Sequence, residues 1–109
     1  MELQKPYYAV IFTNTKNHND EGYAIMAEEM EKLARQQPGF LDFESARSDL
    51  GISISYWESE QAIANWKENA DHKIAQETGI KEWYSWYKVR VCLVEREYSF
   101  EKTPKIKMY

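Results

Sequence analysis

Two side chains in the middle of the chain could take part in aromatic chemistry. Trp66 offers a large flat ring on which a flat substrate can stack. His72, six residues later, carries an imidazole, a group that exchanges protons near neutral pH. Trp66 also shares a helical stripe with Ala62 and Ile63, and large rings at this spacing usually belong to a core. Both interpretations of Trp66 stay open, and the spacing favours the core position.

Four polar side chains are further candidates to line a substrate pocket: Asn14, Arg47, Tyr56 and Arg90. An arginine there can hold a carboxylate or phenolate through its fixed set of N–H donors. The chain also has 18 acidic residues. A cross-strand or inter-subunit ion pair is therefore the alternative for both arginines, and the favoured one.

Composition and charge argue against several classes of protein. The net charge of -4 disfavours nucleic acid and anionic membranes as partners, since both bind basic surfaces. The lone cysteine, Cys92, forms no intrachain disulfide and is expected to be a buried structural thiol, which suits a reducing cytoplasm. No His, Cys and acid spacing typical of a metal site occurs. Neither a signal-peptide pattern nor an apolar run of membrane-spanning length is present, so we expect a cytoplasmic protein.

Alternating and helical spacings of apolar residues predict six elements and a tail. A polar loop at 14–19 separates the first two elements, and Asn19 or Asp20 is expected to cap the first helix. In chain order the elements are a strand at 7–13, a helix at 21–37, strands at 40–47 and 52–57, a helix from residue 60, and a strand at 85–98, with 99–109 as the tail.

Local signals mark several boundaries. Pro38 and the glycine after it end the first helix, and Gly51 is expected to take positive φ in the turn at 48–51. Ser59 is a good cap for the second helix. Asp71 and His72 are expected to break that helix, with a short turn beyond them that ends at Gly79.

The order strand, helix, strand, strand, helix, strand predicts an α+β fold of the ferredoxin-like, split β-α-β kind. Two helices would cover one face of a four-stranded antiparallel sheet. The first and last strands have apolar residues on both faces, and a large exposed apolar face is unusual in a monomer. We therefore expect a homodimer joined through the bare face, with residues 1–98 as one domain and the tail 99–109 packed on the partner. The aromatic residues 83–87 would pack at the dimer seam or close a cleft mouth, and packing is favoured.

Four stretches of the chain carry a family pattern: residues 37–47, 55–59, 62–67 and 87–91. Together they resemble the antibiotic biosynthesis monooxygenase family, in particular its small uncharacterised bacillar-type members. The resemblance covers roughly residues 7–98. It implies a dimeric α+β barrel with a cleft between sheet and helices in each subunit. Some family members oxidise polycyclic phenols to quinones with O₂ and no metal or flavin, others degrade haem, and others have different roles.

Site residues carry over from the family only in part. The family tryptophan of the second helix matches Trp66, which the resemblance places toward the cleft. The quinone-forming branch has an asparagine at the position of Ala62 and a tyrosine at that of His72, so both polar partners are changed here. The haem-degrading branch needs a first-strand asparagine and a helix histidine. Here Asn14 stands only at the strand's end and Gln76 replaces the histidine, so haem cleavage is not expected.

The resemblance implies an oxidoreductase, a cofactor-independent monooxygenase acting on a small or flat aromatic compound. Trp66 would position the substrate, and His72 would help to remove a phenolic proton, with no cofactor. The alternative is a small-molecule-binding or stress-related dimer without turnover. A third possibility is a purely structural dimer whose cleft is filled by its own side chains.

Overall fold

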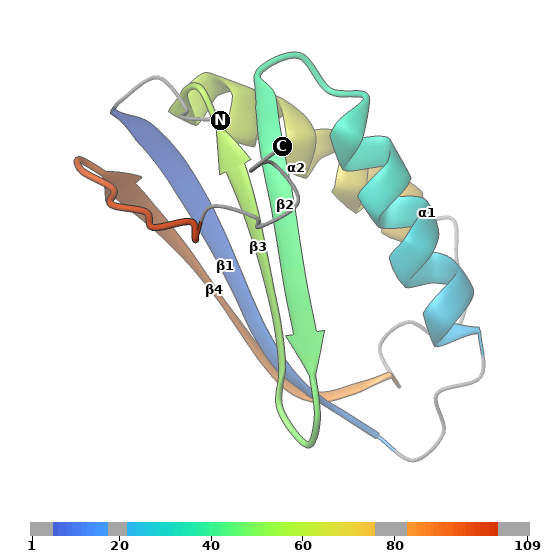
Figure 1. Ribbon diagram of the computed structural model, residues 1–109. Helices are drawn as coiled ribbons and strands as arrows, with labels where there is room; N and C mark the ends of the chain where they lie inside the picture. The colour runs from blue at the N-terminus through green and yellow to red at the C-terminus, as the bar shows by residue number, and fades with distance from the viewer. Residues whose placement is uncertain (1–5, 18–21, 76–82, 103–109) are drawn as a thin grey trace, which may run out of the picture.

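The protein is an α+β sandwich of one sheet and one helical layer (Figure 1). A computed structural model describes residues 6–17, 22–75 and 83–102. The predicted order of elements and the predicted fold class are confirmed. The elements are β1 (Tyr7–Lys16), α1 (Tyr23–Arg35), β2 (Phe40–Arg47), β3 (Gly51–Trp57), α2 (Glu60–Ala75) and β4 (Tyr84–Val94).

The four strands form one antiparallel sheet in the order β2-β3-β1-β4. Residues paired across antiparallel strands point to the same side, and successive residues point to opposite sides. Trp57 packs against helix residues, so its side of the sheet is called the helix face. The opposite side, which includes Ile54 of β3 and Ile11 of β1, is called the outer face.

The helices cover only part of the helix face. Their main contacts are with β2 and β3, and most of β4 lies at the edge away from them (Figure 1). The start of β4 is the exception, because Tyr84 contacts Tyr23 of α1. Ala34 of α1 and Ala62 of α2 are buried against Trp57, and small side chains at these positions let both helices approach the sheet. The partly buried residues around this core are Val10, Phe40, Ile63 and Trp66.

Strand β4 stays largely uncovered on the helix face. Its side chains there are 50 to 60% exposed, although they are apolar or aromatic. Such a stripe is unusual beside a closed core and indicates a surface for binding. The residues of this β4 stripe are Tyr87, Val89, Val91 and Leu93.

Two of the predicted boundary signals are confirmed. Ser59 caps α2, because its Oγ accepts a hydrogen bond of 3.1 Å from the backbone N–H of Ala62. Gly39, in the turn that follows α1, has φ of 85°. A Cβ at this glycine would lie 2.6 Å from the Ala62 Cβ, so the turn packs directly on α2.

Both helices differ from the predicted ranges. Helix α1 starts after Gly22, whose φ is 83°, and ends before Gln37, because a residue preceding proline disfavours helical dihedrals. Helix α2 has no break at His72 and runs to Ala75, and the Lys67–Asp71 ion pair at i,i+4 stabilises the turn that leads to the expected break. Asn19, Asp20 and Gly79, the other boundary residues, lie outside the described residues.

The strands also differ from the predicted ranges, because strand pairing extends or ends them. β1 runs to Lys16 rather than Thr13, since its last residues pair with β4. β4 ends at Val94 rather than Tyr98. Val94 pairs with the first residue of β1, and the proline before that residue has no N–H to extend the ladder. Gly51 was expected in a turn with positive φ, but it begins β3 without it.

Candidate functional site

Three residues from three neighbouring strands form one row across the helix face, level with the start of β3. Asn14 of β1 and Arg47 of β2 are both paired with Gly51, which stands between them. The Arg47 guanidinium lies over Gly51, in the space that any side chain at this position would fill. A glycine in a strand often marks a close approach of this kind, and here it lets an arginine reach across a neighbouring strand.

The Arg47 guanidinium is held from two directions. Its Nη2 donates to the Oδ1 of Asn14 in the sheet and to the Oη of Tyr23 on α1, the latter at 3.1 Å. The guanidinium also lies 5.4 Å from the centroid of the Tyr23 ring. Asn14 is only 1% exposed, and its hydrogen bond offsets the cost of burying an amide in a strand. One helix and three strands therefore fix the position of a single cation.

Aromatic rings surround this cation. Tyr23 stands edge-on to Trp83 and Tyr84, with ring centroids 5.8 and 5.6 Å apart. Tyr84 and Tyr87 both pack on Phe12, which supports them from β1. The Lys16 ammonium lies 4.6 Å from the Tyr23 centroid and adds a second positive charge. The six residues Asn14, Lys16, Tyr23, Arg47, Tyr84 and Tyr87 are called the Arg47 cluster.

The electrostatics of this cluster favour negative charge in a ligand. Burial raises the pKa of Tyr84, and its hydrogen bond with Tyr23 raises it further, while the nearby Arg47 charge lowers it. The Tyr84 phenol is therefore neutral at physiological pH. No carboxylate lies within ion-pair distance of Arg47 among residues 6–17, 22–75 and 83–102. The cross-strand ion pair considered for Arg47 is absent from this part of the chain, and an inter-subunit pair stays a prediction.

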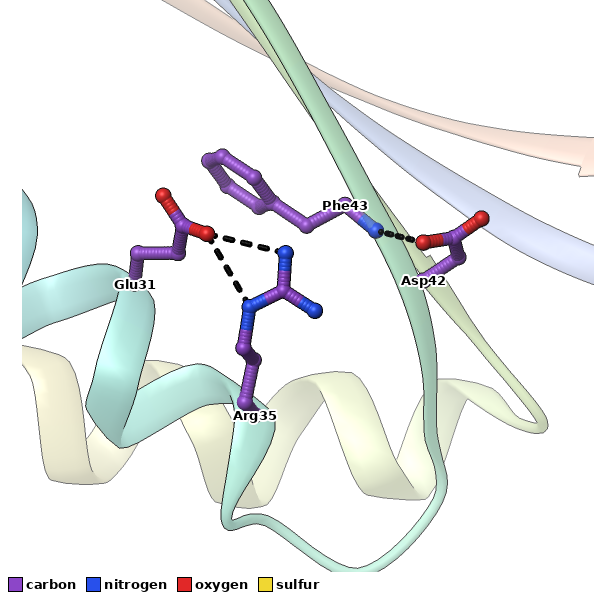
Figure 2. Close-up of polar contacts among 4 residues, drawn as sticks. All are labelled: Glu31, Arg35, Asp42 and Phe43. Carbon is purple, nitrogen blue, oxygen red and sulfur yellow. Dashed lines mark hydrogen bonds and ion pairs between the residues drawn. The ribbon is translucent and has the colours of Figure 1, made fainter.

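A second arginine, Arg35, differs from Arg47 because a carboxylate neutralises its guanidinium. Figure 2 shows Arg35 of α1 with its Nε and Nη2 both directed at one oxygen of Glu31, at 3.0 and 2.9 Å. The same guanidinium lies over the Phe40 and Phe43 rings. Asp42, also in Figure 2, accepts a hydrogen bond from the backbone N–H of Phe43. Arg35 thus has the partner that Arg47 lacks in the described chain.

The structure places Trp66 and His72 apart from the row of Asn14 and Arg47. Trp66 stacks on Trp57 with centroids 5.9 Å apart, at the end of β3 opposite Gly51. Those two ends are six residues apart, about 20 Å along an extended strand. His72 is exposed on α2, with no hydrogen-bond partner in the described part of the chain.

Tyr56 and Arg90 lie on the outer face, so one chain does not bring them together with Asn14 and Arg47. Tyr56 donates to Glu44 at 2.6 Å and stands edge-on to Tyr7. Burial raises the pKa of Tyr56 above its usual range, and the hydrogen bond to Glu44 adds to this. These contacts describe an outer-face surface, separate from the Arg47 cluster.

Residues in the Arg47 cluster other than Asn14 and Arg47 were missed as site residues by the sequence analysis. Tyr23 was placed only within the helix predicted at 21–37, and Tyr84 in the aromatic residues 83–87 expected to pack. One signal was present: Asn14 directly follows a β-rich run, and a buried asparagine needs a hydrogen-bond partner. Nothing in the sequence identified that partner as Arg47.

No group of three or more metal-ligating side chains gathers within the described residues. No described helix is long and apolar enough to cross a membrane.

The sequence profile described as "Antibiotic biosynthesis monooxygenase" matches residues 6–78. The chain belongs to the antibiotic biosynthesis monooxygenase family. This family member is 46% identical over 101 residues to the uncharacterized protein YqjZ of Bacillus subtilis (strain 168). The alignment covers 91% of this chain and 89% of that protein.

Solved structures share the fold of this family member. A protein from Nitrosomonas europaea superposes with a TM-score of 0.68 at 15% identity, covering 84% of this chain and 93% of that one. A mutant of SnoaB from Streptomyces nogalater, described as a cofactor-independent oxygenase, superposes with a TM-score of 0.63 at 11% identity, covering 91% and 98%. At these identities the likeness shows the fold alone.

Proposed function

We propose that this protein is a cofactor-independent monooxygenase that acts on a small or flat aromatic compound. The observation that carries the proposal is the open part of the helix face, where the apolar β4 stripe adjoins the aromatic Arg47 cluster. A flat substrate buries its faces against such rings and aliphatic side chains. The family and the description of SnoaB as a cofactor-independent oxygenase support the reaction class.

The proposed reaction needs only the substrate, O₂ and a base. A base removes a proton from a phenol or from the carbon beside it, and the resulting anion transfers one electron to O₂. The delocalised substrate radical and superoxide combine to a peroxide anion, which takes the proton back from the base. The hydroperoxide then loses water together with the remaining hydrogen of the same carbon and leaves a carbonyl. One oxygen atom enters the product and the other leaves as water. His72 is proposed as the base, and Trp66 as an aromatic wall for the substrate. Tyr56 and Arg90 lie on the outer face, so they are proposed as substrate-binding residues only of a site that a partner protomer completes.

Oxygen uptake with a panel of anthrones and quinols tests the proposal. We expect the wild-type protein to consume O₂ with at least one compound, and His72→Ala to lose most of that rate. Trp66→Phe keeps a ring at the same place and should retain more activity than Trp66→Ala. If the wild-type protein consumes no O₂ with any compound in the panel, the monooxygenase proposal is abandoned.

A non-catalytic binding or stress-related protein is the second candidate. It is favoured by the exposed position of His72, because a general base is normally oriented by a hydrogen-bond partner. Ligand binding without O₂ uptake would select it. Haem cleavage is the less favoured oxygenase activity, since Gln76 stands where that branch has a histidine. A haem titration without a Soret shift would exclude it.

We further propose a homodimer joined through the outer faces of two sheets. Ile11, Ile54 and Ile52 give this face an apolar centre, as interface cores require. Its edges carry opposite charges, with Asp42 and Glu44 on β2 and with Lys88 and Arg90 on β4. A two-fold axis parallel to the strands places β4 of one protomer against β2 of its partner. Each edge then meets its opposite charge.

The tail is proposed to take part in this dimer. Past Val94 the chain turns back (dark red in Figure 1), and Glu97 accepts a hydrogen bond of 2.7 Å from Tyr7 on the outer face. Tyr98 and Phe100 are 87 and 89% exposed, which suits contacts with a partner. We retain residues 1–98 as one domain, 99–109 as a partner-binding tail, and a cytoplasmic location, which cell fractionation tests.

Light scattering coupled to size exclusion tests the dimer. We expect a dimer for the wild type and dissociation for Arg90→Glu or Glu44→Arg alone. The double variant should recover dimer, because the exchanged charges again meet opposite charges. A wild-type monomer at micromolar concentration contradicts the proposal.

A further inference from the structure

The Arg47 guanidinium has unused N–H donors, and its hydrogen bonds hold it in place. A guanidinium has five N–H donors, and the contacts of Arg47 within the described residues use only Nη2. Asn14 and Tyr23 hold that nitrogen, while Gly51 leaves room for the plane of the group. The Nε and Nη1 donors therefore stay in a fixed position, which lowers the entropy lost when an acceptor binds.

Within residues 6–17, 22–75 and 83–102, no carboxylate neutralises Arg47. Around the guanidinium the Arg47 cluster contributes three phenols and the amide of Asn14, all uncharged groups. This differs from the whole chain, whose net charge is -4. It also differs from Arg35, which Glu31 neutralises. An external anion is the partner that fits these donors best.

The distance from the Arg47 guanidinium to the exposed ring of Tyr87 matches the length of a small fused-ring ligand. Tyr87 is paired with Asn14 and is 60% exposed, while Phe12 supports its ring. Gly51, beneath the guanidinium, lies two strands from Tyr87, which is about 10 Å in a sheet. This is the length of a molecule of two or three fused rings with an acidic group at one end. Beyond Tyr87, the β4 stripe continues as an apolar surface for the far ring.

We infer that the Arg47 cluster is a binding site for a planar aromatic anion, with the carboxylate or phenolate oxygens on Arg47 and the ring system on Tyr87 and the β4 stripe. The aromatic half of the ligand rests on the proposed function. Asn14 is a positioning residue, because it contacts the guanidinium and not the ligand. Trp66 takes no part in this site.

Calorimetric titration with 2-naphthoate and 2-naphthamide tests the inference, since these probes share size and rings and differ in charge. We expect the wild type to bind the naphthoate about tenfold more tightly, the scale of a hydrogen bond to a charged group. Arg47→Gln should remove this preference, and Arg47→Lys should keep part of it. Arg35→Gln is the matched control and should keep all of it. Thermal melting establishes that each variant is folded.

Three outcomes overturn the inference: equal wild-type affinity for both probes, no wild-type binding of either at millimolar concentration, or an unchanged preference in Arg47→Gln. If Arg47→Gln does not fold, the wild-type preference and Arg47→Lys decide the question. A naphthoate preference without O₂ uptake from any anthrone or quinol leaves the site standing and removes the monooxygenase proposal. O₂ uptake without a preference for naphthoate leaves the monooxygenase proposal standing and removes the anion site.

Discussion

The two ends of β3 both belong to the helix face of the sheet, but the interactions made there differ. At one end Trp57 is fully buried, its indole N–H donates to Ser55 at 2.8 Å, and Trp66 and Phe40 pack on its ring. At the other end Gly51 carries no side chain, and an arginine with unused donors lies over it. We refer to them as the packed end and the open end.

The difference shows where this fold can bind something. At the packed end every strong interaction of Trp57 is already made inside the protein, so a ligand there would have to displace core contacts. At the open end the donors of Arg47 and the rings beside it are positioned but only partly used. A surface whose groups are fixed and unsatisfied binds at a lower cost than one that must first be opened.

Truncation at the packed end should have the largest effect on stability. We expect Trp57→Ala to lower the free energy of unfolding by about 3–5 kcal/mol, because it removes a buried indole and leaves a cavity. Tyr87→Ala at the open end should cost less than about 1 kcal/mol, since the ring is mostly exposed. Urea unfolding at one fixed protein concentration measures both values. Similar costs for the two variants would remove the distinction between the ends.

The same substitution at two glycines separates stability from binding. Gly39→Ala should cost about 1–3 kcal/mol, because alanine disfavours the positive φ and its Cβ meets Ala62. Gly51→Ala should also cost about 1–3 kcal/mol but for a different reason, since its Cβ meets the Arg47 guanidinium and takes the hydrogen bond from the buried Asn14 amide. It should displace that guanidinium and so lose the preference for naphthoate. Unfolding and titration are measured on both variants, and a Gly51→Ala protein with its preference intact would contradict this account of Arg47.

Helix capping offers a smaller test of the same contrast. Ser59 caps α2 at the packed end, whereas Gly22 begins α1 at the open end without a side-chain cap. We expect Ser59→Ala to cost about 1 kcal/mol, the usual value of a lost N-cap. Ser59→Asp keeps an acceptor and should be close to wild type in urea unfolding. A stability loss equal to that of alanine would show that the hydroxyl does not act as a cap.

The smallest expected effect at neutral pH concerns Tyr7, beside the packed end on the outer face. Its hydrogen bond to Glu97 raises the pKa of the phenol from 10.0 to about 12, and burial and the Glu97 charge add to this. The folded state thus favours the neutral phenol. Its stabilisation is full below about pH 10 and is lost as the pH rises toward 12. Near pH 7 we expect Tyr7→Phe to cost about 0.5–1 kcal/mol.

Urea midpoints of wild type and Tyr7→Phe should therefore converge between pH 10 and 12. Tyrosines other than Tyr7 titrate in both proteins and cancel from the difference. Tyr98→Phe, altered at an exposed ring, is the control and should follow wild type throughout. Parallel curves for Tyr7→Phe and wild type would mean that the hydrogen bond to Glu97 does not shift this phenol.

Several site residues could be found from the sequence, but not their grouping. Asn14 and Arg47 were both candidates, and the structure joins them by a hydrogen bond. Tyr56 and Arg90 were candidates of equal standing and lie on the other face. Whether a strand residue faces the helices depends on which side the helices pack, and no local pattern in the strand carries that information.

The sequence by itself determined the order of elements, the fold class and the signals at Ser59 and Pro38-Gly39, because each depends on residues close together in the chain. Only the tertiary structure decided that β1 continues through Asn14, that α2 continues through His72, and that Arg47 crosses Gly51 to reach a buried amide. The strand extension and the Arg47 contact are made between residues far apart in sequence, and the free energy of pairing and burial there exceeds the weak local preferences of the residues involved.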